Sequence, residues 1–573
     1  MIHFKEGREC FWKMRFMSGL KISRIQGICI LLILGAAACI SILAWVPPVS
    51  RDALTHHLAV PKLYLQHGGI YEIPHLSFSY YPMNLDLLYL IPLYFNNDIL
   101  PKFIHFVFAI ATAVLICWYL ARRINLTYGL LGGLFFLTIP VIVRLSSTVY
   151  VDLGLIFFLF TSLLCLFRWI ETGFKPGYLI AGAVFCGLAL GTKYNGLVGL
   201  FLLALFAAFV YARYNAGHKF AGFKAAGWCA VFITIALLVF SPWMIRNVAW
   251  TGNPVYPLYN SVFESVADSE KTGPENDEER PARVSHIQFR RLAYNESWAE
   301  IALIPLRVFF QGEDDNPRYF DGRTSPFLLI LSVFAFWGIR TAGRQMKTEK
   351  FMMLFFAVLF LLYACVKTSI RIRYFSPIIP PLVILSMYGL HNLQSAIQDR
   401  IPGLPEWTKK TVILIIVFAM LGTNAAYMAE RFNKDQPLAY ITGQFTRDQY
   451  IQKFRPEYAS FEYANKNLAE NDKIFGLFLG NRGYYSDIPI EFGNDLLQWS
   501  APGPEKGSGI AKAMRKNGFT HLLINFNMFN HSIKEKTIRE KKIFKEFLDN
   551  YTVKKFAKHG YGLLQITSDP KSG

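Results

Sequence analysis

The stretch QGICILLILGAAACISILAWVPPVSRDALTHH (residues 26–57) joins an apolar run to a polar segment that contains Asp52. A membrane-spanning helix needs about 20 largely apolar residues, and residues 26–46 provide them. The run ends before two prolines and not at a small-residue cleavage site, so we expect an uncleaved membrane anchor. This places Asp52 at the water-facing mouth of a helix bundle.

Apolar runs of similar character recur along the first three quarters of the chain. Of its 573 residues, 53% are apolar and 16% are aromatic, which is too apolar for a typical soluble protein. We therefore expect an all-α polytopic membrane bundle with about 11 transmembrane helices. These lie near residues 26–46, 101–121, 126–144, 151–169, 178–192, 196–212, 225–245, 326–340, 351–366, 377–393 and 411–428.

Basic residues alternate with the predicted spans. If the N-terminal segment 1–25 is cytoplasmic, every second short connection is also cytoplasmic, and such connections are rich in lysine and arginine. These segments hold 20 Lys and Arg against six Asp and Glu, which accounts for +14 of the net charge of +19. The basic charge is therefore mainly a topology signal, and nucleic-acid binding is not expected.

This topology places three parts of the chain outside the cytoplasm. The outer loop 47–100 contains apolar runs at 58–67 and 85–95 that are too short to span and suit helices in the membrane interface. The outer loop 246–325 includes a polar run at 275–283, which we expect to be partly mobile.

The transmembrane domain covers 26–429, and residues 430–573 are expected to form a soluble extracytoplasmic α/β domain. The pattern predicts strands at 473–479 and 521–526, helices at 509–516 and 533–548, and a hairpin at 551–567.

Charged residues at the outer ends of the predicted spans are the main functional signal, because ionisable groups at membrane depth are costly. Converging from several helices, they would form one cationic chamber with two carboxylates, which suits an anionic lipid headgroup and a proton acceptor. These residues are Asp52, Lys62, Arg144, Asp152, Lys193, Arg246, Lys367, Arg371 and Arg373.

Asp52 is the predicted general base, since a positioned carboxylate can remove the proton of a reacting hydroxyl. The alternative is a helix N-cap. His56 and His57 follow about one helical turn later and could bind substrate or a metal, or form only a polar rim. Asp152 opens the fourth predicted span as a second site carboxylate or as a cap.

The basic candidates suit a phosphate. Lys193 ends an apolar segment and could reach phosphate or simply extend to the interface. An arginine fork binds phosphate oxygens in pairs and stays charged, which favours Arg246, Arg371 and Arg373 over simple interfacial anchors. The other predicted substrate-binding residues are Lys62, Tyr81, Tyr194 and Tyr374.

A metal site is not assigned, although a divalent cation is possible. The acids at 313–315 carry oxygen ligands of the kind that bind such ions, but acidic runs in loops are usually only solvated. The eight cysteines fall in predicted spans or in the N-terminal segment, so neither a disulfide framework nor a cysteine metal site is expected.

Over residues 20–430 these motifs together resemble the GT-C superfamily of bacterial membrane glycosyltransferases. The resemblance is to the family of dolichyl-phosphate-mannose–protein mannosyltransferases and the aminoarabinose lipid A transferase. Two departures are that a single acid followed by His56 and His57 replaces the family's acidic pair, and that the C-terminal unit matches no known catalytic domain. The motifs are the first-loop acid Asp52, the span-opening acid Asp152, Gly187 to Lys193, Pro242 to Asn247, and Arg373 to Pro377.

The resemblance implies a polyprenyl-phosphate-linked sugar donor, a glycan, lipid or protein acceptor, an outward-facing site in the bacterial inner membrane, and inversion at the anomeric carbon. A transporter or lipid-linked-sugar flippase is the alternative. Transporters tend to show internal repeats and binding groups near mid-membrane. No repeat is evident here and the ionisable residues cluster at one face, which favours the transferase over a transporter. A non-catalytic assembly partner is a third possibility.

Overall fold

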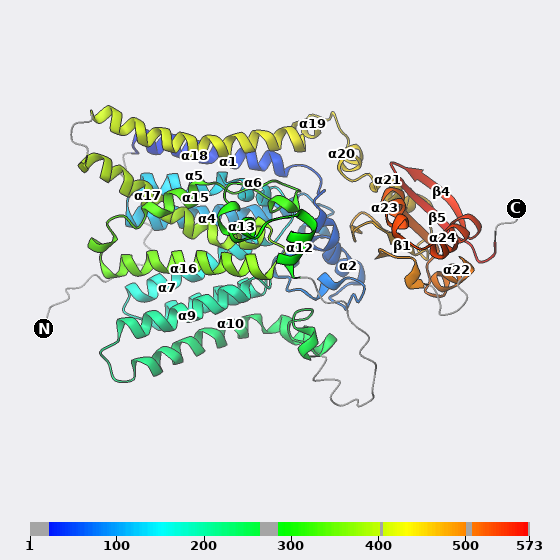
Figure 1. Cartoon of the computed structure of the whole chain (residues 1–573), viewed down its shortest axis with the longest axis horizontal. Helices are drawn as coiled ribbons and strands as arrows, with labels where there is room; N and C mark the ends of the chain where they lie inside the picture. Colours follow the sequence, from blue (N-terminus) through cyan, green and yellow to red (C-terminus); the bar gives the residue numbers. More distant parts are fainter. Residues whose placement is uncertain (1–21, 264–284, 401–404, 500–506, 571–573) are drawn as a thin grey trace.

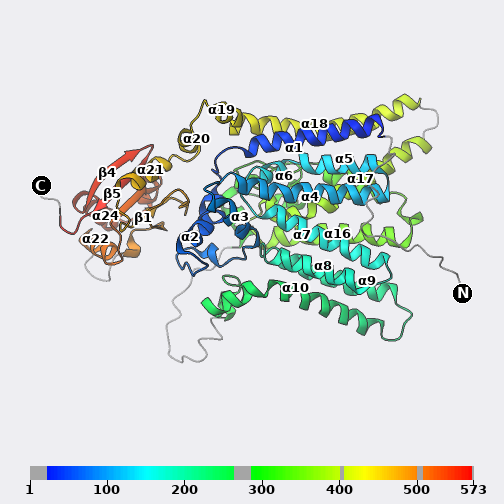
Figure 2. The ribbon, with the colours of Figure 1, turned by 180° about the vertical axis from the view of Figure 1, so that it is seen from behind.

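The computed structural model describes residues 22–263, 285–400, 405–499 and 507–570 (Figure 1). Most of the basic N-terminal segment and the polar run at 275–283 lie outside the described residues. The rest of the chain forms a long helical bundle and a small C-terminal domain at one end of it (Figures 1 and 2).

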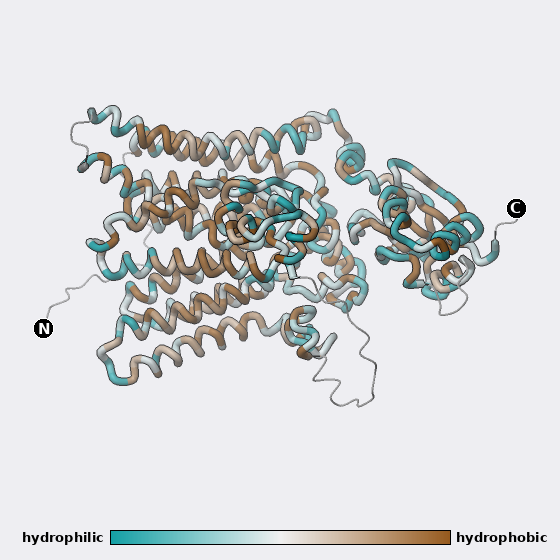
Figure 3. Tube along the Cα trace, in the orientation of Figure 1, coloured by the Kyte–Doolittle hydropathy of each residue, from teal (hydrophilic) through white to brown (hydrophobic). Residues whose placement is uncertain are grey.

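Among the described residues, seven helices are long and apolar enough to cross a membrane. They lie side by side, and Figure 3 shows that their middle parts are hydrophobic and their ends hydrophilic. The protein is therefore a multi-pass membrane protein, and the prediction of an all-α bundle is confirmed. The helices are α1 (Arg24–Ala44), α4 (Leu100–Arg123), α7 (Asp152–Glu171), α9 (Gly196–Tyr214), α10 (Ala221–Thr251), α16 (Arg344–Lys367) and α18 (Glu406–Asp435).

The remaining predicted spans are also helical, and most of them are shorter or bent. The pair α5 (Leu126–Thr138) and α6 (Pro140–Ser146) bends by 66° and gives an eighth crossing if it is one span. Pro140 explains the bend, because proline opens a new helix but cannot continue the preceding one. The described residues thus give seven or eight spans by length and composition, against about 11 expected.

Three predicted spans correspond to α8 (Pro176–Leu190), α15 (Phe327–Phe334) and α17 (Ile379–Arg400). Helices α8 and α15 have 15 and eight residues, fewer than the roughly 20 that a full crossing needs. Gly389 lets α17 approach α15 closely, because a Cβ there would lie 1.8 Å from the carbonyl oxygen of Leu331.

The end of the bundle next to the C-terminal domain, which we call the site end, is covered by short helices. The predicted runs at 58–67 and 85–95 form α2 (Ala59–His67) and α3 (Asn84–Tyr94). The other short elements there are η1 (Ala53–His57), η2 (Ser77–Tyr80), α12 (His286–Tyr294), α13 (Trp298–Ala302), α14 (Ile304–Arg307), η3 (Pro317–Tyr319) and η5 (Ile372–Ile378). The element η4 (Ile339–Thr341) lies at the opposite end.

The C-terminal domain is built on one five-stranded sheet with the order β2-β1-β3-β5-β4. The strand β1 pairs in parallel with β2 and β3, and β5 pairs antiparallel with β3 and β4. The strands are β1 (Ile474–Leu477), β2 (Ile490–Gly493), β3 (His521–Asn525), β4 (Thr552–Lys558) and β5 (Tyr561–Ile566). The prediction of an α/β domain is confirmed, although β2 was not predicted.

Helices cover both faces of this sheet. Phe544 and Phe547 of α24 pack with Phe475 and Leu564 on one face, and Phe461 of α21 packs with Ile474 and Leu563 on the other. These contacts give the domain its own apolar core. The elements outside the sheet are α19 (Pro437–Ile441), α20 (Arg447–Phe454), α21 (Tyr458–Asn467), η6 (Leu497–Trp499), α22 (Gly507–Lys516), α23 (Phe526–Ser532), η7 (Ile533–Glu535) and α24 (Ile538–Asn550).

Candidate active site

Asp52 lies on the short connection between α1 and η1, which is a single π-helical turn. Two prolines at 47 and 48 keep α1 from continuing. Asp52 directly precedes η1, but among the described residues its side chain makes no capping hydrogen bond to that turn. The carboxylate is used elsewhere, so the N-cap alternative does not describe it.

The carboxylate of Asp52 is paired with Arg373, which lies in η5. Asp52 Oδ2 and Arg373 Nη2 are 2.7 Å apart, and the guanidinium carbon lies 4.8 Å from the ring centre of Tyr150. Burial is the largest single effect and raises the pKa of Asp52, but the favourable interactions of the carboxylate, led by the positive charge of Arg373, together lower the pKa below its ordinary value. Asp52 is therefore ionised at neutral pH.

Asp152 and Lys193 form a second ion pair. Asp152 is the first residue of α7, and its Oδ1 lies 2.7 Å from Lys193 Nζ. Its side chain is only 1% exposed, and its Oδ2 has no hydrogen-bond partner within the described part of the chain. A buried carboxylate of this kind depends strongly on its one cationic partner.

The two ion pairs meet at Tyr374. Lys193 Nζ and the guanidinium carbon of Arg373 each lie 5.3 Å from the centre of the Tyr374 ring. Asn195 holds this segment by donating from Nδ2 to the carbonyl oxygen of Tyr374 at 3.1 Å. The structure thus brings four predicted charged residues into one network, although they come from four separate parts of the chain.

Asp52 borders a cavity of about 450 Å³ between the bundle and the C-terminal domain. We call it the junction cavity, and Asp152, Lys193 and Arg373 are not among its lining residues. The expected single chamber with both carboxylates is therefore replaced by one carboxylate at a cavity and a second one buried behind it. The lining of the junction cavity includes Ser50, Asp52, Arg144, Tyr150, Arg371 and Arg455.

Arg246 occupies a neighbouring part of the site. Its guanidinium carbon lies 4.6 and 4.8 Å from the ring centres of Trp243 and Trp250. Its Nη2 donates to the carbonyl oxygens of Tyr80 and Tyr81 at 2.6 and 3.1 Å. Its Nη1 is buried without a hydrogen-bond partner among the residues the structure describes, so this nitrogen has N–H groups available for a ligand.

Tyr81 and Tyr194 lie between Arg246 and the paired acids. Their ring centres are 5.3 Å apart, and Tyr194 directly follows Lys193. Tyr194 Oη donates to the carbonyl oxygen of Tyr256 at 2.9 Å and accepts from Asn247 Nδ2 at 3.1 Å. These aromatic side chains give the region between the cations a partly apolar wall.

His56 and His57 are enclosed by protein. His57 Nδ1 lies 2.7 Å from Asp86 Oδ1, and the His56 ring stacks on Phe78 with 4.4 Å between ring centres. Burial lowers the pKa of both histidines to about 3 and raises that of Asp86 to about 7. Both imidazoles are therefore neutral near pH 7, and His57 Nδ1 and the Asp86 carboxyl group share one hydrogen bond.

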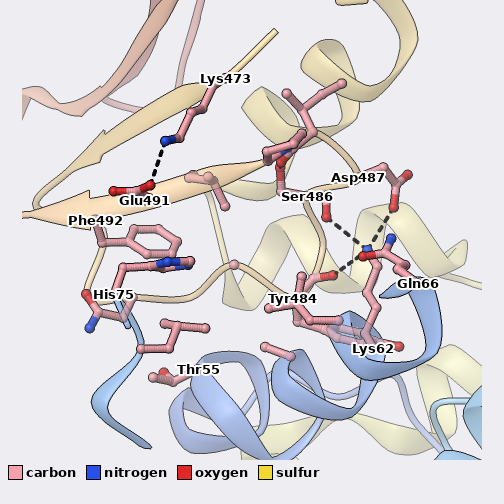
Figure 4. A pocket seen from close by; sticks show the side chains of 18 of the residues that line it. Thr55, Lys62, Gln66, His75, Lys473, Tyr484, Ser486, Asp487, Glu491 and Phe492 are labelled. Atoms are coloured by element: carbon pink, nitrogen blue, oxygen red, sulfur yellow. Dashed lines mark hydrogen bonds and ion pairs between the residues drawn. The ribbon is translucent and has the colours of Figure 1, made fainter. Parts of the chain in front are cut away.

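Lys62 points toward the C-terminal domain (Figure 4). Its Nζ donates to the carbonyl oxygens of Tyr484 and Ser486 at 2.9 Å each and pairs with Asp487 at 2.8 Å. It lines a second cavity of about 250 Å³, where Lys473 pairs with Glu491 at 2.6 Å (Figure 4). The Lys62 ammonium therefore joins α2 to the C-terminal domain.

The C-terminal domain also holds the chain on both sides of Asp52. Tyr485 Oη donates to the carbonyl oxygen of Pro48 at 2.8 Å, and the backbone N–H of Tyr484 donates to that of Leu54 at 3.1 Å. Arg455 donates from Nε to the carbonyl oxygen of Val49. The domain thus positions the segment that carries the predicted base.

The acidic run at 313–315 is tied to basic side chains. Arg144 contacts Asp314, Asp315 and Asp321 at 3.3, 2.7 and 3.1 Å, and Tyr427 donates to Asp314 at 2.6 Å. The described residues contain no group of three or more His, Cys, Asp or Glu side chains placed to hold a metal ion. The use of a divalent cation stays a prediction.

Several residues of this region were not predicted from the sequence, and three of them illustrate why. Asp86, Lys102 and Arg455 contact the first-loop segment or line the junction cavity. Asp86 is a lone acid in an apolar run and Lys102 is a cation near the start of a predicted span, so each carried a signal. Arg455 lies in a polar helical region with no such contrast.

The chain is similar to one protein family over part of its length and to solved structures over most of it. The model of the family described as dolichyl-phosphate-mannose-protein mannosyltransferase matches residues 82–245, which is less than half of the chain. No curated protein sequence matches the chain.

Among solved structures, ArnT from Cupriavidus metallidurans in the apo state is similar with a TM-score of 0.54 and 14% identity, covering 95% of this chain and 99% of that one. The same protein bound to undecaprenyl phosphate gives 0.53 and 12%, over 94% and 98% of the two chains. The Archaeoglobus fulgidus oligosaccharyltransferase with a tethered acceptor peptide gives 0.52 and 10%, over 93% and 74%. At these identities, the likeness establishes the fold.

Proposed function

The chain has the GT-C fold, as its motifs predicted, and from that premise we propose that it is a membrane glycosyltransferase. It moves a sugar from a polyprenyl-phosphate donor to an acceptor hydroxyl on the extracytoplasmic side. Two observations on relatives support the lipid donor, namely the family model over 82–245 and the ArnT structure with bound undecaprenyl phosphate. Because a fold alone does not fix a function, the roles of individual residues are inferred from the geometry of the site.

Asp52 acts as the general base. The acceptor oxygen bonds to the anomeric carbon, the bond from that carbon to the phosphate oxygen breaks, and its electron pair stays on the leaving phosphate. The hydroxyl proton passes to the Asp52 carboxylate. The single observation that carries this role is that Asp52 is an ionised carboxylate bordering the junction cavity, whereas Asp152 is 1% exposed.

Arg246 and Lys193 stabilise the phosphate that leaves. Arg246 has a buried Nη1 without a partner among the described residues, and a guanidinium holds its charge against a phosphate. An apolar groove of about 630 Å³ runs along α10 beside it, lined by Leu237, Leu238 and Ile245 among others, and suits a polyprenyl chain. Stabilisation of the developing negative charge is often the largest catalytic effect in such sites.

Asp152 is a positioning residue in this proposal, because its pair with Lys193 fixes the ammonium beside Tyr374. Arg373 plays the same part for Asp52. His56 and His57 follow Asp52 in the same segment, and the contact of His57 with Asp86 helps to hold this segment in place. Arg371 lines the junction cavity, where it contacts Asp321 at 3.5 Å.

The proposed orientation places the site end outside the cytoplasm of a bacterial inner membrane. The connections between α9 and α10 and before α16 lie at the opposite end, and they carry Arg213, Lys219, Lys224, Arg340 and Arg344 (Figures 1 and 3). Such an excess of basic residues marks the cytoplasmic side.

The test uses purified protein in liposomes with radiolabelled polyprenyl-phosphate sugars and membrane extract as the acceptor source. We expect label to move from the lipid to an extract component with wild-type protein and with E430Q, a surface control whose side chain is 51% exposed. D52N should reduce transfer by about 10²–10⁴-fold, the usual share of a general base. Label that crosses the bilayer without changing carrier would instead indicate a flippase.

A further inference from the structure

The junction cavity has a surplus of positive charge. Seven basic side chains and four acidic ones line it. Four of the basic side chains have carboxylate partners, since Arg144 and Lys434 pair with Asp315, Arg371 with Asp321, and Arg431 with Asp435. The surplus is therefore concentrated in the other three.

These three are Arg51, Lys102 and Arg455, and within the described part of the chain none of them has a carboxylate oxygen within 4 Å. Lys102 donates to the carbonyl oxygen of Val46 at 2.7 Å, and Arg455 donates to that of Val49. Both contacts hold the cations against the first-loop segment without neutralising their charge.

The surplus positive charge in the junction cavity is unfavourable when no anion is bound there. Burial and the nearby Arg482 lower the pKa of Arg455, which means that its surroundings oppose the charged form. Like charges in a partly enclosed space repel more strongly than in water. An anion that entered the cavity would remove this cost, and it would lie next to Asp52, which also lines the cavity.

We propose that the junction cavity is the acceptor site and that the acceptor is an acidic saccharide, carrying a phosphate or carboxylate near the hydroxyl that is glycosylated. This rests on the proposed function and adds the substrate class. A volume of about 450 Å³ suits one or two sugar units. Tyr150 and Phe454 supply apolar surface for sugar faces, and Arg51, Lys102 and Arg455 bind the anion.

The donor phosphate is a less fitting occupant of this cavity. A lipid-linked donor reaches the protein from the bilayer, and the apolar groove that suits its chain runs along α10 beside Arg246. The junction cavity is instead lined by Tyr450, Phe454 and Arg455 of the C-terminal domain region and by the end of α18. The two substrates thus have separate binding surfaces, one on α10 and one in the junction cavity.

Binding can be measured without any donor or transfer. Isothermal titration of the full-length protein in nanodiscs would use three probes, namely glucose 1-phosphate, glucuronate and glucose. We expect both charged sugars to bind and neutral glucose to bind at least tenfold more weakly. Comparison of the phosphate and carboxylate probes then identifies which anion is preferred.

The variant R51Q tests the cavity directly, because Arg51 is exposed and makes no described contact that folding needs. It should weaken binding of the charged probes about tenfold, as expected for loss of one charge-assisted contact. The matched control K434Q removes a cation that is already paired with Asp315 and should change binding less than twofold.

Equal binding of glucose and the charged sugars, or unchanged binding in R51Q, would overturn the proposal. Charged-probe binding that depends on Arg51 in a protein without transferase activity would support the acidic-saccharide site and reject the proposed function. Transfer to a neutral acceptor at a rate unaffected by R51Q would support the proposed function and reject the acidic-saccharide site.

Discussion

The two acid–cation pairs at the site end have the same contact distance but different surroundings. Asp52–Arg373 and Asp152–Lys193 both have nitrogen–oxygen distances of 2.7 Å, and both cations contact the ring of Tyr374. The side chain of Asp52 is 21% exposed and borders the junction cavity, whereas that of Asp152 is 1% exposed. In the proposed mechanism, access to the junction cavity therefore separates Asp52, the proposed base, from Asp152, the proposed positioning acid.

The largest expected contrast concerns stability. D152N removes the charge that partners Lys193 and leaves a mostly buried ammonium unpaired, which costs about 3 kcal/mol of unfolding free energy. In D52N the guanidinium of Arg373 keeps its contacts with Tyr150 and Tyr374, and the new amide lies at the edge of the junction cavity, where water can reach it, so the cost should be about 1 kcal/mol or less. Thermal denaturation of both variants in the same detergent measures the difference. Equal losses would contradict the distinction between the two pairs.

The next contrast concerns pH. Since Arg373 lowers the pKa of Asp52, the carboxylate should stay ionised, and transfer should stay constant, as the pH falls from 8 to 5. Activity and the stability from this pair are lost only below that range, as pH falls through the lowered pKa. In R373Q the pKa of Asp52 rises because the effect of burial is no longer offset by the arginine. The acidic limb of the pH–activity profile should therefore move to higher pH. The control R371K should keep the wild-type profile, and an unshifted limb in R373Q would argue against Asp52 as the titrating base.

The smallest expected effect concerns the C-terminal domain. Y485F removes one hydrogen bond to Pro48, which contributes about 1 kcal/mol, and loosens the segment that carries Asp52. We expect the transfer rate to fall about three- to tenfold with little change in donor affinity. The control Y463F alters a tyrosine that stacks on Phe556 within the C-terminal domain. If Y463F and Y485F behaved alike, the contact with Pro48 would have no special role.

Much of the helical architecture could be predicted from the sequence, because apolar length and basic connections are properties of single segments. Which predicted spans form shorter helices could not be read from the sequence, since α15 is short and packs closely on α17 through Gly389. The strand β2 has only four residues and is defined by its pairing with β1, which local pattern does not reveal.

For the site too, the sequence reveals what depends on single segments and not what depends on tertiary packing. Asp52, Asp152, Lys193 and Arg373 could be placed at one end of the bundle from their positions beside predicted spans. Which acid pairs with which cation depends on the tertiary packing of four distant segments. Lys62 illustrates the limit, because its contacts are with Tyr484, Ser486 and Asp487 of a domain more than 400 residues away in the chain.

The most direct test of the central claim is a single-turnover measurement with donor already bound to D52N. The account predicts that the lipid-linked sugar binds as tightly as to the wild type, because Arg246 and Lys193 are unchanged, while transfer slows by at least about 100-fold. Transfer from the bound donor at the wild-type rate would contradict Asp52 as the base.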